Sequence, residues 1–253
     1  MSTTTTAIRI PAVKTERLFY LIAAVAMMAG VALGFHMFYL HGTNDVGLPV
    51  TKQSAPLVYF HGGLMTCWMV LFLAQCWLVV AGNRRLHMQL GAGAVVLYLL
   101  IVPVGAIAAV LQIRYVAPHS FPPFGPYRFL ILPLTEILNF AVFVGAAFLL
   151  RSRPQWHRPL MTIGTLSAAQ AGIGRIAVIR NAFSHVSHAA FFPTFWGPTV
   201  VVVLLLCVLK LAMTRRFDRP FAICVALFVT SGLLSSYVST TARWIHTAQA
   251  ITR

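Results

Sequence analysis

Long apolar runs alternate with short polar segments along the whole chain. About 20 apolar residues are enough for a helix to cross a bilayer, and each run is close to that length. The segments between the runs are rich in Pro, Gly or Asn, which is typical of turns between helices. The pattern predicts an all-α integral membrane protein, a seven-helix transmembrane bundle with spans at 18–40, 56–81, 89–113, 127–150, 159–181, 196–213 and 220–245.

The N-terminal segment 1–17 is polar and basic. No short apolar region with a small-residue cleavage site follows it, so we expect the first span to be retained and not removed as a signal peptide. The sequence therefore predicts a cytoplasmic tail over 1–17 and a single seven-span membrane domain over 18–253. We expect its core over 56–181, with the other three spans packed around that core.

The composition supports a membrane location. Only 9% of the residues are charged, against about 25% in a typical soluble domain. The formal net charge is +15, but the Lys and Arg residues lie between apolar runs and form no patch interleaved with aromatic residues. This arrangement indicates contact with lipid headgroups and excludes a nucleic-acid interface. The expected partners are the lipid bilayer and, in addition, other membrane subunits or a quinone.

The positions of Lys and Arg predict the direction of the spans, because cytoplasmic loops are enriched in these residues. With a cytoplasmic N-terminus, one side holds Arg9, Lys14, Arg17, Arg84, Arg85, Arg151, Arg153, Arg158, Lys210, Arg215, Arg216 and Arg219. The other side holds Lys52, Arg114, Arg128, Arg175, Arg180, Arg243 and Arg253. We therefore expect the N-terminus in the cytoplasm, the C-terminus outside, and a location in the bacterial cytoplasmic (inner) membrane.

Glu136 is one of only four acidic residues, and it stands inside an apolar run. From the inner ends of their predicted spans, Glu136 lies at a depth of roughly 21 Å and Arg175 at roughly 24 Å. A short loop joins the two spans, so they are expected to be antiparallel neighbours. The sequence predicts a Glu136–Arg175 pair, either as a structural ion pair or as a proton, ligand or catalytic site.

The second predicted span carries a stripe of residues on one helical face: His61, Met65, Trp68, Phe72 and Gln75. Lipid cannot satisfy the polar atoms of His, Trp and Gln, so this face is expected to point into the bundle. The stripe is interpreted either as an interior polar seam or as a cofactor or quinone pocket lined by His61, Trp68 and Gln75.

Histidines are placed in pairs that match in depth. His36 lies four residues and His61 five residues from the outer ends of their predicted spans, while His87 and His157 each stand in an H-x-x-L motif that opens a span from the inner side. Depth-matched histidines on different helices are typical of axial haem ligation. The sequence predicts candidate haem b sites at His36/His61 and at His87/His157; contact with lipid headgroups is the alternative.

A weaker pattern, "FSHVSH", places His185 and His188 three residues apart. With His246 or His41 they form a candidate copper or zinc site. The four cysteines lie within apolar runs without metal-type spacing. The sequence contains no paired carboxylates, HExxH, GxSxG or phosphate-binding loop, which removes the common hydrolase and nucleotide-binding classes.

Four segments together resemble an uncharacterised bacterial family of multi-pass membrane proteins: "HGGLMTCWMVLFLAQ" (61–75), "GNRRLHMQLG" (82–91), "HRPLMTIG" (157–164) and "GIGRI" (172–176). The matching positions are Gln75, His87, Leu90, Gly91, His157, Leu160, Met161 and Arg175, whereas Met88 and Gln89 depart from the family pattern. The resemblance covers about half of the chain and implies no activity. The helix layout of the family is distantly similar to cytochrome b561-like cores, a likeness of fold alone.

Three functional hypotheses follow from these residues. The first is a redox-linked membrane protein that binds haem b or a quinone between its helices. The second is a transporter, or an accessory or assembly subunit of a membrane complex, in which Glu136 and Arg175 form a structural or switchable pair. The third is an intramembrane enzyme that acts on a lipid-like substrate and uses Glu136.

Overall fold

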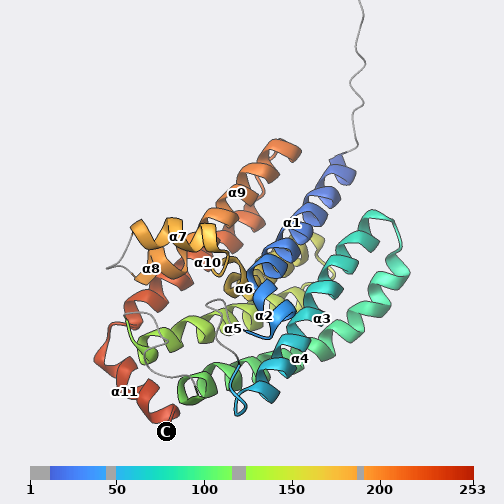
Figure 1. Ribbon diagram of the computed structural model, residues 1–253. Helices are drawn as coiled ribbons and strands as arrows, with labels where there is room; N and C mark the ends of the chain where they lie inside the picture. Colours follow the sequence, from blue (N-terminus) through green and yellow to red (C-terminus); the bar gives the residue numbers. More distant parts are fainter. Residues whose placement is uncertain (1–11, 44–49, 116–123, 187–190) are drawn as a thin grey trace, which may run out of the picture.

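The computed structural model describes residues 12–43, 50–115, 124–186 and 191–253, and these residues form a helical bundle without β-strands (Figure 1). The helices are α1 Ala12–Gly34, α2 His36–His41, α3 Ala55–Val80, α4 Arg84–Tyr115, α5 Pro126–Leu149, α6 Pro154–Ile173, α7 Ala177–Val186, α8 Phe191–Phe195, α9 Gly197–Thr214, α10 Arg219–Val238 and α11 Ala242–Ile251. The α3–α4 hairpin lies on one side of the bundle and the α9–α10 hairpin on the other (Figure 1).

Six of the described helices are long and apolar enough to cross a membrane: α1, α3, α4, α5, α9 and α10. The bent pair α6–α7 makes seven if it is counted as one span. The prediction of an all-helical protein is therefore confirmed for the described residues, and six to seven of their helices are candidate membrane spans by length and composition. Three predicted spans, at 56–81, 127–150 and 196–213, correspond to single helices whose ends differ by one residue, and the span at 89–113 lies within α4, which starts five residues earlier.

Three predicted spans are not single straight helices. The span predicted over 18–40 breaks at Phe35, between α1 and α2, and the span predicted over 220–245 ends at Val238, before α11. The span predicted over 159–181 bends by 88° between Pro154–Ile173 and Ala177–Phe183. Apolar composition predicts where a chain enters lipid, but a break between helices depends on local backbone hydrogen bonding.

The break before α11 has an identifiable cause. The hydroxyl of Thr241 donates to the carbonyl of Val238 at 2.8 Å and accepts from the backbone N–H of Trp244 at 3.3 Å. A threonine in this position caps the N-terminus of a new helix. The indole N–H of Trp244 then donates to the carbonyl of Tyr127 at 2.9 Å, which attaches α11 to the start of α5.

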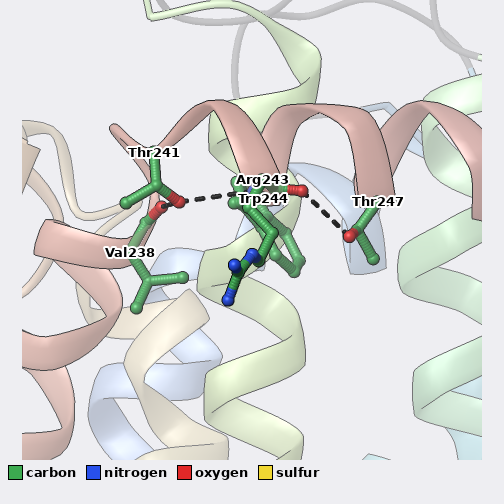
Figure 2. A pocket seen from close by; sticks show the side chains of 5 residues that line it. All are labelled: Val238, Thr241, Arg243, Trp244 and Thr247. Atoms are coloured by element: carbon green, nitrogen blue, oxygen red, sulfur yellow. Dashed lines mark hydrogen bonds between the residues drawn. The ribbon is translucent and has the colours of Figure 1, made fainter.

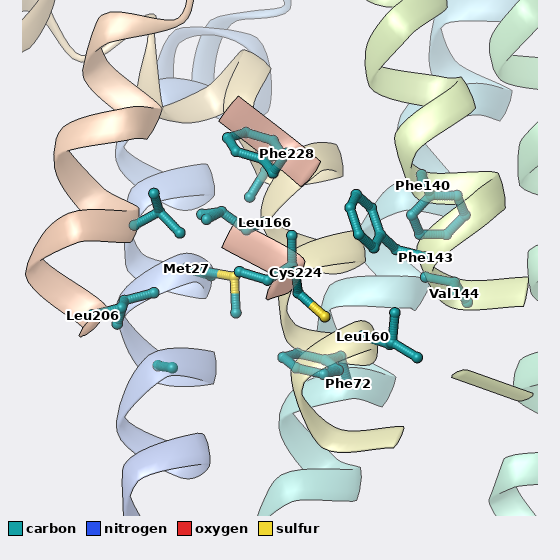
Figure 3. Packing of buried hydrophobic residues seen from close by; sticks show 14 of the residues in the cluster. Met27, Phe72, Phe140, Phe143, Val144, Leu160, Leu166, Leu206, Cys224 and Phe228 are labelled. Atoms are coloured by element: carbon teal, nitrogen blue, oxygen red, sulfur yellow. The ribbon is translucent and has the colours of Figure 1, made fainter. Parts of the chain in front are cut away.

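The helix α6 lies at the centre of the bundle and packs against α1, α3, α5, α9 and α10. Figure 3 shows Leu160 and Leu166 of α6 among Met27 of α1, Phe143 of α5 and Phe228 of α10. Most of its side chains are buried, including Thr162, Thr165, Ser167 and Gln170. Neighbouring helices cover α6 in place of lipid, so it tolerates small and polar residues that an exposed span would not.

Polar contacts bring several helix ends together at one end of the bundle. Arg158, near the start of α6, forms an ion pair of 3.0 Å with Glu16 of α1. Arg17 donates to the carbonyl of Val79 at 3.4 Å, and this bond joins the start of α1 to the end of α3. Lys210 near the end of α9 contacts Asp218, which precedes α10, at 2.5 Å. These ends all belong to the side that the sequence assigns to the cytoplasm.

Candidate functional site

The inner histidines His87 and His157 are brought together by the fold. His87 lies in the first turn of α4, and His157 lies in the first turn of α6. The two rings are close enough for His157 to act electrostatically on His87. Both side chains are half-buried. The sequence predicted the two residues at the same end of the bundle, and the structure places both in the first turns of their helices at that end.

The helices that carry this pair are diagonal neighbours. In the four-helix group, α3 packs on α4, α4 on α5, α5 on α6, and α6 on α3. His87 and His157 therefore lie on helices that are not adjacent in the ring. A site between diagonal helices is a common location for cofactors in helix bundles.

The two rings differ in their hydrogen bonding. Nδ1 of His157 lies 2.9 Å from the carbonyl oxygen of Ala147, at the end of α5, so this ring nitrogen is engaged. Nδ1 of His87 is buried without a hydrogen bond of normal geometry, although the ring interacts with the backbone of Gln75 as a longer hydrogen-bond partner. One histidine is thus oriented by the protein, and the other keeps a ring nitrogen without a partner of normal geometry.

Two further buried polar atoms on α3 lack a partner. They are Oε1 of Gln75 and Nδ1 of His61. Buried polar atoms without a hydrogen-bond partner are rare in proteins, and a bound water or ligand commonly supplies the partner. The backbone of Gln75 lies beside the His87 ring, so the inner ends of α3 and α4 each carry one unpaired polar atom.

Other members of the stripe on α3 are fully engaged in packing. The indole N–H of Trp68 donates to the hydroxyl of Thr165 at 3.3 Å, and its ring contacts Phe140 edge-to-face at 4.9 Å. Trp68 is 2% exposed and Phe72 is 7% exposed. The stripe faces the interior as predicted, but Trp68 has the contacts of a structural residue.

The outer histidines are not brought together. His36 is exposed, and its Nδ1 lies 2.6 Å from the carbonyl oxygen of Leu33 in the preceding helix. The His61 ring lies beside Gly105 of α4, where Ile137 of α5 also packs. The two side chains therefore have different neighbours, and no described contact joins them. The prediction from depth along a span did not include the direction of each ring around its helix.

Glu136 and Arg175 do not form the predicted direct pair, because no ion pair within 4.0 Å joins them in the part of the chain that the structure describes. The helix α6 begins at Pro154, five residues before the predicted span. Ser167 consequently lies level with Glu136 and donates to its backbone carbonyl at 3.3 Å. Arg175 lies eight residues beyond Ser167, or about 12 Å along a helix.

Arg175 is located at the bend after α6. Its Nη1 donates to the carbonyl of Ala171 at 2.6 Å, and its guanidinium lies 4.8 Å from the ring centroid of Phe35. Glu136 is half-buried in the middle of α5, and Arg175 still acts on it electrostatically. The bend thus directs the arginine toward the junction of α1 and α2.

The predicted copper or zinc site falls where the structure gives no side chains. His188 lies outside the described residues, and so does the side chain of His185. Over residues 12–43, 50–115, 124–186 and 191–253, no group of three or more His, Cys, Asp or Glu side chains is arranged to hold a metal ion. Axial haem ligation needs only two histidines.

A buried cluster around Lys210 was missed in the sequence. Lys210 is 3% exposed, and its ammonium group donates to the hydroxyl of Tyr20 at 2.6 Å and to Asp218 at 2.5 Å. The same group lies 4.6 Å from the ring centroid of Phe221. The signal was a single Lys within an apolar run and an Asp eight residues later, the same kind of pattern that drew attention to Glu136 and Arg175.

A groove of about 450 Å³ lies at the junction of α10 and α11 and contains none of the predicted site residues. It is lined by Val238, Thr241, Arg243, Trp244 and Thr247. Figure 2 shows that the Thr241 and Thr247 hydroxyls bond to backbone atoms of their own segment. The groove is therefore separate from the site of His87 and His157, and its hydroxyl groups are already hydrogen-bonded.

Comparisons of the chain with protein families, with curated proteins and with solved structures found no match. The resemblance of segments 61–75, 82–91, 157–164 and 172–176 to an uncharacterised membrane family stays a prediction.

Proposed function

We propose that this chain is a redox-linked protein of the bacterial cytoplasmic membrane and that it binds haem b between His87 and His157. The observation that carries the proposal is the placement of these two half-buried histidines in the first turns of α4 and α6, at the same end of the bundle, where His157 acts electrostatically on His87. A half-buried pair of imidazoles at the end of an apolar bundle is typical of axial haem ligation. The proposal concerns the inner pair only, since His36 and His61 have different neighbours.

The residues at this site fit such a group. The contact of His157 Nδ1 with the carbonyl of Ala147 leaves Nε2 as its available ligand atom. Histidine ligands commonly have their second nitrogen held by a carbonyl in this way, which fixes the ring orientation. Haem b bound there would supply one-electron transfer to the protein.

The surrounding residues would orient the bound group and exclude water. Gln75, whose backbone lies beside the His87 ring, carries an unpaired side-chain amide oxygen that would suit a hydroxyl or propionic acid donor or an intervening water. Farther along α3, Phe72 and Trp68 close the interior with apolar surface. The amide of Gln75 would also suit a quinol, whose hydroxyl groups donate hydrogen bonds, and a quinone is the alternative ligand of the same site.

The orientation with a cytoplasmic N-terminus belongs to this proposal. Its support is the meeting of the ends of α1, α3, α6, α9 and α10 at one end of the bundle. That end also carries the larger share of the Lys and Arg residues. The proposed haem would then lie near the cytoplasmic surface.

A second candidate function is a transporter or an accessory subunit of a membrane complex, and it depends on Glu136. The carboxylate lies in the middle of α5 and forms no hydrogen bond or ion pair with another described side chain. Ionisable groups inside a span frequently mark ion or proton pathways. The bend after α6, which places Arg175 nearby, is also typical of transporters, whose sites use interrupted helices.

Haem content per polypeptide separates these candidates. We expect wild-type protein purified from haem-replete cells to contain haem b, and His87→Ala and His157→Ala to lose most of it. The matched control is His246→Ala, because His246 is exposed on α11 and the substitution should leave haem content unchanged. A haem-free wild-type protein that still loses function in Glu136→Gln would favour the transporter or accessory class.

A further inference from the structure

A groove of about 160 Å³ lies between α9 and α10, at the end of the bundle that holds Lys210. It is separate from the histidine site and is lined by side chains from both helices and from the turn that joins them. The lining residues used below are Cys207, Val208, Lys210, Leu211, Arg216 and Phe217.

The groove has one basic group that is not engaged elsewhere. The charge of Lys210 is directed to Asp218 and Tyr20. The guanidinium of Arg216 forms no hydrogen bond or ion pair within the described part of the chain, where only its backbone carbonyl accepts a bond, from Thr214. Arg215 and Arg219 flank it. The segment 210–219 therefore carries four positive charges, from Lys210, Arg215, Arg216 and Arg219, and one negative charge, from Asp218.

The rest of the groove is apolar and faces outward. Val208 is 65% exposed, Leu211 is 52% exposed and Phe217 is 74% exposed. Val208 and Leu211 lie on α9, which is one of the helices long and apolar enough to cross a membrane, so acyl chains are their natural neighbours. The groove therefore presents a cationic group at its polar end and an apolar wall along the helix.

The turn that carries Arg216 is held in place by specific contacts. The Thr214 hydroxyl donates to the carbonyl of Lys210 at 2.8 Å, and Arg215 adopts a left-handed backbone conformation with φ of 52° that ends α9. Asp218 caps α10 by accepting from the backbone N–H of Phe221 at 3.0 Å. The position of Arg216 relative to the helix ends is thus fixed before any ligand arrives, which lowers the entropic cost of binding.

We infer that this groove binds an anionic phospholipid from the adjacent leaflet. Arg216 contacts the headgroup phosphate, and one acyl chain lies along Val208 and Leu211. The net positive charge of the turn favours a lipid with net negative charge over a zwitterionic one, and basic pockets between helices near the cytoplasmic surface are typical sites for such lipids. A soluble phosphate would use Arg216 but would leave the apolar wall without a partner.

Cys207 lines the groove and provides a direct measurement of its occupancy. The full chain is reconstituted in nanodiscs of phosphatidylcholine with or without phosphatidylglycerol, and alkylation of each cysteine is followed by mass spectrometry. We expect phosphatidylglycerol to slow modification of Cys207 by roughly fivefold, the factor that one basic residue near an anionic surface contributes. Cys67 faces outward from the middle of α3, outside the groove, and its rate with a membrane-permeant reagent serves as the internal control for access to thiols that face lipid.

Arg216→Gln should abolish the dependence of Cys207 on phosphatidylglycerol while leaving the Cys67 rate unchanged. Arg85→Gln is the matched control, because Arg85 is exposed at the same end of the bundle but does not line the groove. The inference is overturned if Cys207 reacts equally fast in both lipids, or if Arg216→Gln keeps the wild-type difference. Equal protection by inorganic phosphate in phosphatidylcholine nanodiscs would assign the groove to a soluble anion and also overturn it.

Discussion

The ammonium group of Lys210 lies inside the bundle, where several side chains contact it. Asp218 and the hydroxyl of Tyr20 accept hydrogen bonds from it, and the rings of Phe19 and Phe221 lie within cation–π distance. A buried ion pair contributes little net stability, but removing one partner leaves an uncompensated charge in a medium of low dielectric constant. The cluster should therefore act as a unit.

This leads to a prediction for a double-mutant cycle. Asp218→Asn should destabilise the protein by about 3–5 kcal/mol, whereas Lys210→Met combined with Asp218→Asn should recover much of that loss. Thermal unfolding in detergent measures all variants. Additive losses at Lys210 and Asp218 would contradict the account.

A double-mutant cycle on Glu136 and Arg175 provides the comparison with the cycle on Lys210 and Asp218. The two side chains interact electrostatically without a direct ion pair, so their coupling should be clearly smaller than that of Lys210 and Asp218. A coupling energy equal to that of the Lys210 cluster would show that Glu136 and Arg175 are in contact after all.

At the residue scale, the end of the bundle at which His87 and His157 lie was predictable, whereas the depth of Arg175 relative to Glu136 and the direction of side chains around their helices were not. His87 and His157 were expected at the same end because both open spans from that side, and the structure brings them together. His36 and His61 were also matched in depth, yet His61 points to α4 and α5 while His36 is exposed. A rotation about the helix axis decides such a contact, and a single sequence gives only weak information on it.

The central helix α6 shows most clearly how composition and position are related. It has about 20 residues, or roughly 30 Å of helix, which is enough to cross the hydrocarbon core. It is also less apolar than six other helices, each of which is long and apolar enough by itself to cross a membrane. The helix α6 qualifies only when it is counted together with α7. Burial by other helices, and not contact with lipid, accounts for its Thr, Ser and Gln residues.

Close approach of α1 to α6 depends on glycine. A Cβ atom added at Gly34 would collide with the backbone carbonyl group of Gly172. Gly34→Ala should therefore push the helices apart and destabilise the protein by about 1–3 kcal/mol, as overpacking typically does. Thermal unfolding measures the effect.

Gly91→Ala is the matched control for that substitution. Gly91 lies within α4, and nothing stands within 4 Å of an added Cβ, so alanine should be neutral or slightly stabilising there. Equal stability of the Gly34→Ala and Gly91→Ala proteins would contradict the close packing of α1 on α6.

Helix ends could be predicted where an apolar run and a turn signal coincide. The segment 56–81 was predicted within one residue at each end of α3, because "SAP" and "AGN" flank it. The start of α6 was misplaced by five residues because Pro154, at the start of the helix, was interpreted as part of the loop. This shift moved Arg175 away from the level of Glu136 and removed the direct pair.

At the scale of the whole molecule, the orientation in the membrane remains a proposal with a direct test. In a background without the native cysteines, Arg151→Cys and Ala250→Cys each place one thiol at an exposed position near opposite ends of the bundle. A membrane-impermeant thiol reagent applied to intact cells should label the cysteine at 250 and leave that at 151 unlabelled. The reverse pattern would show that the N-terminus is outside.

The multi-pass architecture followed from sequence because the apolar runs are long and separated by clear turn signals. The order of packing around α6 did not, since it depends on which small residues meet: Gly34 meets Gly172, and Gly164 lies against Phe143 and Val144. These contacts join segments that are distant in the chain.

The ligation of haem by His87 and His157 is tested most directly by near-infrared magnetic circular dichroism of the oxidised protein, because this spectrum reports the identity of the axial ligands. The account predicts a bis-imidazole signature in the wild-type protein and its loss in both His87→Ala and His157→Ala, with His36→Ala unchanged. A wild-type protein without haem after expression in haem-replete cells, or a bis-imidazole signature that survives in the His157→Ala protein, would contradict it.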